Sequence, residues 1–488
     1  MEKDDSFRLT RRSLLAGTAA LGSNILPGSA AFADPLQTVS KDAAAAAKAL
    51  AAGRSVGLRV LIPSGSQDNV RPVATSFQSQ TGISVELAEV PLEDINTHLI
   101  LASFGGGAPI DIALPATYGM PDLVDAGVLR SLSDFALTYE PAELRQGILY
   151  DVGDSFDDTL YGFQTDGDTY LMFYNERMLR DPEAQAQYAD QTGRALDIPQ
   201  TWDELDRQMA FFHRPDQGQF GGALFRRSGY LAWEWWVRFH AKGIWPFAKD
   251  LTPQIDGEEG NAALEELIAA SQHLIPEADA YDIFQNWERF AQGNIYCNIG
   301  WGGTQKYLNG PNSAIRGQLA FGPTPGGIVK DQLLETPYFN WGWNYVVTQA
   351  STEAEISYLF CLFASSPDMS TEAVRAAGGF FDPFRAEHYA DPVIRDVYSD
   401  AFLAVHRESL LSSIPDLYLA SQIEYFTVLD NWLFAATRQD VSARDALHRV
   451  AQEWALITIR TGAEKQRERW NNLRALYPAK AQRLLSDL

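Results

Sequence analysis

Short apolar segments alternate with amphipathic ones over the first quarter of the chain. Residues 58–63 and 83–87 have the apolar or alternating pattern of strands, whereas 70–81 has apolar residues at helical spacing and stops at Gly82. The same reading predicts a helix at 95–104, a strand at 110–114 and a helix at 120–126. This alternation predicts an α/β fold with mainly parallel sheets covered by helices on both faces.

The pattern changes after residue 160, where helices become more frequent than strands. The length of 488 residues exceeds what one hydrophobic core normally supports, so two or three units are expected. A Gly/Pro-rich segment at 322–327 has the composition of a linker. We predict strands at 170–175, 295–299 and 343–347, and helices at 203–212, 229–242, 260–273, 286–292, 353–365 and from 392 to the C-terminus.

The N-terminal segment has the features of an export signal. Arg11 and Arg12 precede a weakly apolar stretch, and Ala31-Phe32-Ala33 is a typical cleavage pattern. We predict a twin-arginine signal peptide at 1–33, with a general secretory signal as the alternative. Residues 34–55 form an Ala-rich leader for which we predict no buried face and only loose docking. No cysteine follows the apolar stretch, so the expected product is a soluble periplasmic protein without a lipid anchor.

The amino-acid composition excludes some classes of binding partner. The chain has 39 Lys and Arg against 63 Asp and Glu, a formal charge of −24, which argues against nucleic acid and anionic lipid as partners. No apolar run is long enough to span a membrane. Only Cys297 and Cys361 are present, and both lie in apolar segments. We predict two buried free thiols, with a single disulfide as the alternative.

No motif in the chain indicates catalysis or a cofactor. The sequence has no nucleophile elbow, zinc-protease helix, phosphate loop or dinucleotide fingerprint, and its seven histidines lack ligand spacing. We therefore predict no catalytic residue, no metal and no cofactor.

Several segments in register resemble one family. Residues 108–113, 123–135, 160–179, 290–301, 321–327 and 358–367, together with Pro199, Thr201 and Trp202, resemble the extracellular solute-binding proteins of bacterial ABC importers, in the carbohydrate-binding group that includes maltose-binding protein. The resemblance implies two α/β lobes joined by crossing strands, with a ligand between them. It places one lobe at 56–163 with 324–380 and the other at 164–321 with 384–488, with crossings at 163–166, 321–324 and 381–385.

Candidate ligand residues follow from sugar chemistry and from the resemblance. A sugar needs flat aromatic faces and fixed polar groups. Trp301 comes directly after a predicted strand, and Asp168 corresponds to a sugar-binding acidic residue of the family. For the tryptophans the alternative is core packing; for the aspartates it is a turn cap, or a catalytic pair, although we expect these two carboxylates to point apart. The full set is Ser64, Gly65, Pro115, Thr117, Asp166, Asp168, Tyr230, Trp233, Trp301, Trp341, Trp343 and Arg385.

Arg385 has two interpretations in this scheme: it clamps an acidic sugar, or it pairs with Asp382 to stiffen the hinge. The resemblance implies a monomeric binding protein that delivers a carbohydrate (mono- or oligosaccharide) or polyol to the permease subunits of an ABC transporter. The alternatives are a carbohydrate-active enzyme that uses two cleft carboxylates, and a binding protein for a polyamine or an amino acid.

Overall fold

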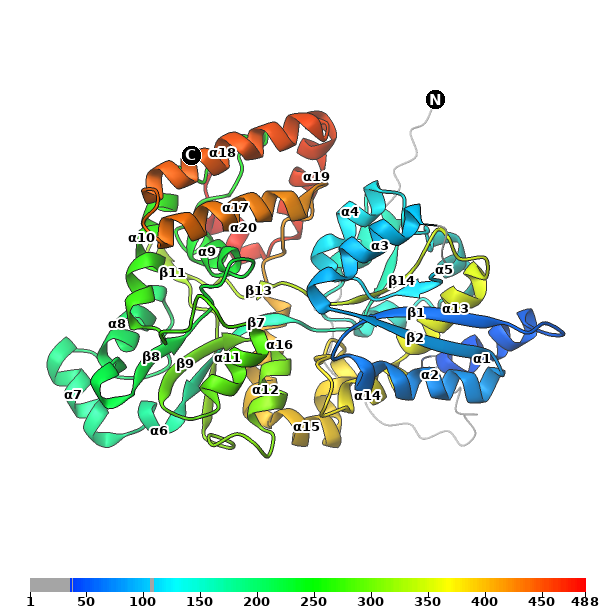
Figure 1. The fold of residues 1–488 in the computed structure, drawn as a ribbon, viewed down its shortest axis with the longest axis horizontal. Helices are drawn as coiled ribbons and strands as arrows, with labels where there is room; N and C mark the ends of the chain where they lie inside the picture. Colours follow the sequence, from blue (N-terminus) through cyan, green and yellow to red (C-terminus); the bar gives the residue numbers. More distant parts are fainter. Residues whose placement is uncertain (1–35, 37, 106–108) are drawn as a thin grey trace, which may run out of the picture. The chain divides into compact units, whose positions relative to one another are not determined.

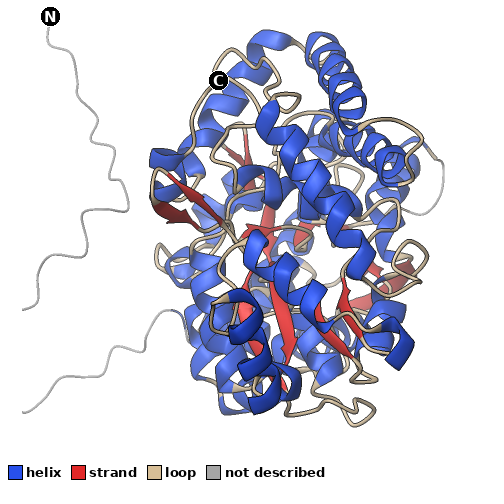
Figure 2. Ribbon diagram, turned by 90° about the vertical axis from the view of Figure 1, so that its left-hand side faces the viewer, coloured by secondary structure: helices blue, strands red, loops and turns tan. Residues whose placement is uncertain are grey.

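The structure is a computed structural model that describes residue 36, residues 38–105 and residues 109–488 (Figure 1). The predicted signal peptide and the start of the leader lie outside the described residues. The helices and strands predicted before residue 366 are all present, with boundaries within three residues of those expected. Helices cover the strands of both sheets (Figure 2).

The first sheet has the strand order β2-β1-β3-β14-β6. β1 runs parallel to β2 and to β3, whereas β14 is antiparallel to both β3 and β6. Its strands are β1 (Gly57–Pro63), β2 (Ser84–Val90), β3 (Ile112–Ala113), β6 (Gly162–Gln164) and β14 (Asn344–Val347). The helices of this lobe are α1 (Val39–Leu50), α2 (Gln67–Thr81), α3 (Ile95–Phe104), α4 (Met120–Asp125), α5 (Ser133–Tyr139), α13 (Ala354–Ala364) and α14 (Pro367–Arg375).

The second sheet has the order β10-β7-β9-β8, with β13 also paired to β7. Its strands are β7 (Thr169–Asn175), β8 (Phe220–Ala223), β9 (Ile295–Gly300), β10 (Leu319–Pro323) and β13 (Tyr338–Phe339). Only β8 and β9 are parallel within this sheet as described; β7 is antiparallel to all three of its neighbours. The sheet is therefore mixed: β8, β9, β10 and β13 share one direction, and β7 runs against it, as β14 does in the first sheet.

Helices of the second lobe surround this sheet and continue to the C-terminus. They are α6 (Glu176–Leu179), α7 (Pro182–Thr192), α8 (Trp202–Phe212), α9 (Leu231–His240), α10 (Glu258–Ala270), α11 (Ile283–Phe290), α12 (Gly302–Leu308), α15 (Pro392–Tyr398), α16 (Asp400–Leu411), α17 (Gln422–Thr437), α18 (Ala443–Arg460), α19 (Ala463–Leu476) and α20 (Ala479–Leu484). Two small ribbons complete the fold: β4 (Ser155–Phe156) with β5 (Thr159–Leu160), and β11 (Gly327–Val329) with β12 (Gln332–Leu334).

The second crossing between the lobes lies later than predicted. The Gly/Pro segment at 322–327 does not lead into the first sheet, because β13 still pairs with β7. The chain reaches the first sheet only at β14, so the crossing falls at 340–343 instead of 321–324. Residues 324–339 therefore belong with the second lobe. The composition of the segment indicated a turn, and only strand pairing decides which sheet follows it.

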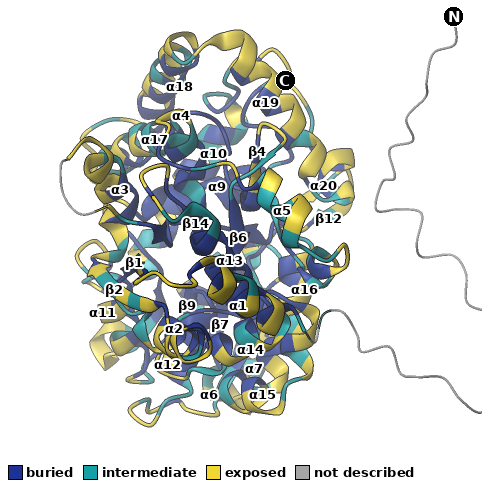
Figure 3. Ribbon diagram, turned by 90° about the vertical axis from the view of Figure 1, so that its right-hand side faces the viewer, coloured by how far each residue is buried: buried dark blue, intermediate teal, exposed yellow. Residues whose placement is uncertain are grey.

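The described part of the Ala-rich leader contains a docked helix, contrary to the prediction. Helix α1 packs on α13 and α2, and Val39, Ala43, Ala44 and Ala47 are buried there. The face that we took as lacking apolar character is a stripe of methyl groups, which suffices where a neighbouring helix approaches closely. The opposite face of α1 is exposed (Figure 3).

The close approach of α1 predicts a size limit at its buried positions. Ala47→Leu is expected to lower the free energy of unfolding by about 1 kcal/mol, because a larger side chain overpacks the contact with α13. Ala45→Leu on the exposed face has a similar helix propensity and is expected to leave stability within about 0.5 kcal/mol of wild type. Urea unfolding of the two variants checks this; equal stabilities would contradict the docked helix.

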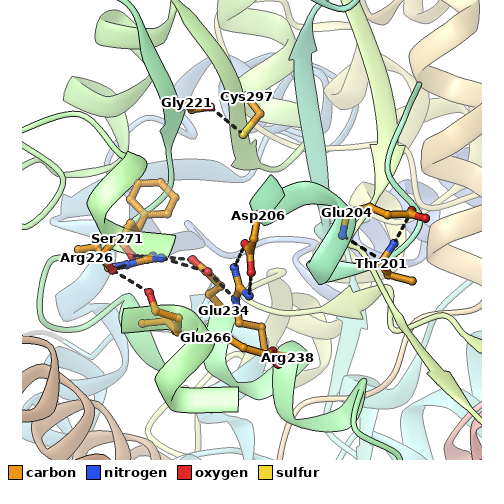
Figure 4. Close-up of polar contacts among 12 residues, drawn as sticks. Thr201, Glu204, Asp206, Gly221, Arg226, Glu234, Arg238, Glu266, Ser271 and Cys297 are labelled. Atoms are coloured by element: carbon orange, nitrogen blue, oxygen red, sulfur yellow. Dashed lines mark hydrogen bonds and ion pairs between the residues drawn. The ribbon is translucent and has the colours of Figure 1, made fainter. Parts of the chain in front are cut away.

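Both cysteines are buried and free, which confirms the prediction of two thiols. The Sγ atom of Cys297 donates a hydrogen bond to the carbonyl oxygen of Gly221 at 3.4 Å (Figure 4). Burial raises the pKa of both thiols, so neither is a reactive thiolate.

Candidate functional site

An apolar cavity, here called the aromatic slot, lies between the two lobes. Its volume is ≈ 40 Å³, enough for a few water-sized atoms. Phe380 and Trp343 come from the first lobe, and Trp301 and Trp287 come from the second. The lining residues are Leu92, Asp168, Ile283, Phe284, Trp287, Trp301, Gly303, Trp341, Trp343 and Phe380. Asp168 is the one charged side chain among these described lining residues.

A larger cavity of ≈ 640 Å³, the polar groove, shares Trp341 with the aromatic slot. Glu93 and Tyr118 reach it from the first lobe. The second lobe supplies Arg227, Ser228, Gly229, Tyr230, Ala232, Trp233, Asp282, Asp416, Gln422, Ile423, Phe426, Thr427, Asp430 and Asn431. The slot and the groove together are called the cleft below. Aromatic faces and hydrogen-bonding groups thus occur side by side, as ligand pockets require.

Trp301 is positioned by the end of a buried strand. It follows β9 directly and begins α12, where its backbone N–H donates to Oγ1 of Thr304 at 3.1 Å. Its indole Nε1 donates to Oδ1 of Asn340 at 2.9 Å, which fixes the ring orientation. The ring centroid lies 5.0 Å from that of Tyr170. Because its edge is anchored and its side chain reaches the aromatic slot, the ring offers a rigid wall.

Trp341 sits in the crossing segment with an unusual backbone. Its φ of 65° is in the left-handed region that disfavours bulky residues, so the surrounding contacts must hold it. The N–H of Thr117 donates to the carbonyl oxygens of Trp341 and Gly342, both at 3.0 Å. Oδ2 of Asp168 accepts the N–H of Gly342 at 3.2 Å. Thr117, predicted as a ligand contact, instead holds the backbone that presents Trp341.

Three buried carboxylates converge below the aromatic slot. Asp166, Asp168 and Asp382 each offer an oxygen within 4.8 Å of the others. The expectation that Asp166 and Asp168 point apart is wrong, because both lie in the crossing segment between β6 and β7 and not on one regular strand. Asp166 is fully buried, whereas Asp168 lies at the slot surface. Oxygen ligands at this spacing are of the kind that hard cations take, although the set is three groups only.

Hydrogen bonds and burial set the charge of this cluster. The N–H of Asp382 donates to Oδ1 of Asp166 at 2.7 Å, and Asp382 accepts the N–H of Gly302 and the hydroxyl of Tyr398 at 2.7 and 2.8 Å. Burial raises the pKa of all three carboxyl groups, and their mutual repulsion raises that of Asp166 and Asp168 further. The buried ammonium of Lys306 opposes this, and burial lowers its own pKa to about 8.

Tyr230 and Trp233, two of the candidate ligand residues, lie at the polar groove. The hydroxyl of Tyr230 donates to Oε1 of Glu93 at 2.8 Å, a hydrogen bond between the lobes. Trp233 packs edge-on against both Trp301 and Trp341, with centroid separations of 5.9 and 5.5 Å. The neighbouring Trp235 and Trp236 are fully buried and are core residues. One turn of α9 therefore divides its tryptophans between core and cleft.

Three other candidates, Ser64, Gly65 and Pro115, make contacts within the first lobe. Ser64 donates its hydroxyl to the carbonyl oxygen of Val90 at 3.0 Å. Gly65 has a φ of +98°, and a Cβ there would lie 3.0 Å from the ring of Phe380. The carbonyl oxygen of Pro115 accepts the N–H of Asn344 at 3.3 Å. None of these three residues is among the described lining residues of either cavity.

The structure separates Arg385 from the cleft, so neither interpretation of this residue holds. Its side chain is fully buried, and Nη2 donates to the carbonyl oxygen of Leu144 at 3.1 Å and to Glu387 at 3.4 Å. Asp382 is bonded elsewhere, to Gly302 and Tyr398.

Sequence reasoning missed several lining residues. Trp287 and Phe380 form walls of the aromatic slot, and Tyr118, Asp416 and Gln422 line the polar groove. In the sequence, Trp287 belongs to the apolar face of a short helix, and Phe380 belongs to a predicted crossing segment. Neither pattern indicates a ligand contact. The C-terminal helix α17 carries much of the groove, although nothing in its local sequence distinguishes it from a packing helix.

Asp416 predicts a pH effect on stability. Burial raises its pKa to about 7, above the value of about 3.9 expected in the unfolded chain. The folded protein therefore binds the extra proton, and stability is expected to fall as pH rises from about 4 to 7, by about 1 kcal/mol per pH unit at mid-range. Asp416→Asn should flatten this slope in urea titrations, whereas the exposed Asp216→Asn should not. An unchanged slope in Asp416→Asn would contradict the assignment.

No helix within the described residues is both long and apolar enough to cross a membrane. A family model described as bacterial extracellular solute-binding protein matches residues 73–398. No curated protein matches the chain.

Solved structures with the same fold come from several bacteria. T. maritima MalE3 with bound maltose has a TM-score of 0.70 at 17% identity, covering 83% of this chain and 100% of that one. An ABC transporter solute-binding protein of Agrobacterium vitis with D-mannitol has a TM-score of 0.67 at 16% identity, covering 84% and 99%. One from Agrobacterium radiobacter with ribitol has a TM-score of 0.68 at 17% identity, covering 82% and 98%. The chain has this two-lobed α/β fold, and it belongs to the bacterial extracellular solute-binding proteins.

Proposed function

We propose that the protein binds a carbohydrate or polyol in the cleft and delivers it to the permease of an ABC importer in the inner membrane. The observation that carries this is the composition of the cleft: aromatic faces in the slot lie beside carboxylate, amide and hydroxyl groups in the groove, and both lobes contribute. Aromatic faces pack on the C–H side of a sugar ring, and the polar groups bond its hydroxyls. The maltose, mannitol and ribitol bound by proteins of similar fold support this ligand class.

Lobe closure is the proposed signal of occupancy. A ligand that contacts both lobes favours the closed state by the difference between its affinities for the closed and open states. Glu93, Tyr118 and Phe380 supply the first lobe's share, and Trp301 and Trp233 the second's. The closed form would present a surface to the permease that the open form does not.

The positions of the carboxylates fit a binding protein better than they fit a glycosidase. Glycosidases place two carboxyl groups on opposite sides of a scissile bond, about 5–9.5 Å apart. In the cluster below the slot, only Asp168 lines the cavity, and Asp166 and Asp382 are fully buried beneath it. We propose that the protein acts without a cofactor, as a monomer, in the periplasm after twin-arginine export.

The test is a thermal-shift and calorimetric screen of the protein from residue 34 against sugars, polyols, polyamines and amino acids. A ligand at 100 times its Kd should stabilise the protein by about 2.7 kcal/mol. Trp301→Ala should weaken binding by about tenfold or more, because it removes one aromatic face that packs on the sugar ring. Trp432→Ala is the matched control, since that half-buried ring lies outside both cavities and bonds Glu453.

Three results would contradict the proposal. Consumption of a sugar during the assay would indicate an enzyme. Binding of polyamines or amino acids alone would keep the family and overturn the ligand class. Equal affinities of Trp301→Ala and Trp432→Ala for a bound sugar would place the site elsewhere.

A further inference from the structure

Acidic side chains outnumber basic ones on the walls of the cleft. Arg227 is the single basic residue among the described lining residues of the slot and the groove. The acidic lining residues are Glu93, Asp168, Asp282, Asp416 and Asp430. Carboxylates accept hydrogen bonds from the hydroxyls of a neutral sugar, but such a ligand leaves the excess of acidic groups without a counter-charge.

The imbalance is strongest beneath the aromatic slot. Asp166, Asp168 and Asp382 converge within 4.8 Å, and Lys306 is the buried cation beside them. The ammonium of Lys306 donates to three backbone carbonyl oxygens, those of Val374, Ala376 and Phe381, at 3.3, 2.9 and 2.9 Å. Its hydrogen bonds are thus used on carbonyls, and three buried carboxylates face one cation.

The walls of the slot suit a cation as well. Six aromatic rings line it: Phe284, Trp287, Trp301, Trp341, Trp343 and Phe380. Aromatic faces attract ammonium groups, most strongly where water is excluded. The protein's own cations do not use these faces, since no cation–π contact among the described residues involves any of the six rings.

Unused polar atoms also point to a missing partner. Trp287 and Trp341 are more than nine-tenths buried, and their indole Nε1 atoms donate to no group in the described protein. Oε1 of Gln422, a lining residue of the polar groove, is a buried acceptor without a donor among the described residues. Buried polar atoms are normally satisfied, so orphans at a cavity wall are completed by what binds there. Donors and acceptors occur together, as a ligand with both hydroxyl and ammonium groups requires.

We propose that the natural ligand is an amino sugar or amino polyol, with its ammonium group in the aromatic slot against Asp168 and its hydroxylated body in the polar groove. This inference rests on the proposed function and narrows its ligand class. The volumes agree with this division: ≈ 40 Å³ holds an ammonium and the carbon that bears it, and ≈ 640 Å³ holds a sugar. Trp341, which lines both cavities, would contact the ligand at the junction.

The acidic cluster explains why the protein would distinguish strongly between an ammonium group and a hydroxyl group. Three buried carboxyl groups converge there, and the ammonium of Lys306 is bonded to backbone carbonyl oxygens. An ammonium at Asp168 would add a second positive charge to the cluster and form charge-assisted hydrogen bonds. A hydroxyl at the same position supplies no charge.

The experiment compares pairs of ligands that differ in one group, by calorimetry on the full mature protein in buffer with EDTA, which removes divalent metal ions from the acidic cluster. The pairs are D-glucosamine with D-glucose, and glucamine with sorbitol; N-acetylglucosamine serves as the neutral amide. We expect the amino member to bind at least about tenfold more tightly in at least one pair, and N-acetylation to abolish that preference. Asp168→Asn should also abolish it, and the exposed Asp190→Asn should retain it.

The wild-type comparison stands even if Asp168→Asn fails to fold. Equal or tighter binding of the neutral members would overturn this inference and leave the proposed carbohydrate function intact. Binding of putrescine with no binding of any hydroxylated compound would overturn both. A preference for the amino compound that persists in folded Asp168→Asn would show that the ammonium group does not bind at Asp168.

Discussion

Glu234→Ala is expected to lower the free energy of unfolding by about 3–5 kcal/mol, because it leaves the buried Arg226 without a carboxylate and Arg238 with Asp206 alone. Glu234, on α9, is bonded to Arg226 at 3.2 Å through Oε1 and at 2.5 Å through Oε2, and to Nε of Arg238 at 2.8 Å (Figure 4). All three side chains are at most 4% exposed. Burial alone would raise the pKa of Glu234, but the two guanidinium groups outweigh it and hold the pKa below its usual value.

Urea unfolding at pH 7 measures this loss. Glu234→Gln, which keeps the shape and removes the charge, should fall between wild type and Glu234→Ala. The matched control is Glu266→Gln, whose ion pair with Lys242 is partly exposed and should contribute less than about 1 kcal/mol. Because the folded pKa is depressed, the contribution of Glu234 is present above about pH 4.3 and is lost as pH falls through the folded pKa. A loss below 1 kcal/mol in Glu234→Ala would show that the network is not essential to the second lobe.

Arg469→Ala is expected to shift the protein from the closed toward the open arrangement of its lobes by about 2 kcal/mol, roughly 30-fold in the ratio of the two states. Arg469 lies on α19, and Nη2 contacts Asp125 at 2.9 Å and Asp157 at 2.8 Å, both in the first lobe. The arginine side chain is 5% exposed, whereas the carboxylates are 41% and 33% exposed. The solvated carboxylates moderate the loss, and the buried guanidinium makes it larger than for a surface pair.

Small-angle scattering of the ligand-free protein measures this shift as a larger radius of gyration, and ligand affinity should fall because closure becomes costlier. Arg467→Ala, on the same helix and without an ion pair to the first lobe among the described residues, should change neither. Addition of saturating ligand should restore the compact form in Arg469→Ala. An unchanged radius would mean that other contacts hold the lobes, such as the bond from the N–H of Ile423 to Asp122 at 3.1 Å.

Individual helices and strands could be predicted from the sequence because each has a characteristic spacing of apolar residues. Helix 95–104 was predicted at its observed bounds, and Trp301 was placed after a strand, where the structure has it. The two-lobed fold followed from segments in register with a known family and is confirmed by the family model and the solved structures. Strand alternation and helical spacing are properties of neighbouring residues, so a sequence expresses them directly.

The tertiary structure decided what depends on distant pairing. The docking of α1 requires α13, more than 300 residues away, and the crossing at 340–343 depends on β13 pairing with β7. The cluster of Asp382 with Asp168 joins residues separated by two crossings, and the sequence showed them only as single aspartates. The part of the polar groove that α17 lines also depends on the packing of residues that are distant in the sequence. Local composition sets whether a segment is a helix or a strand, but the partner that buries a charge or completes a cavity is fixed only when the chain closes on itself.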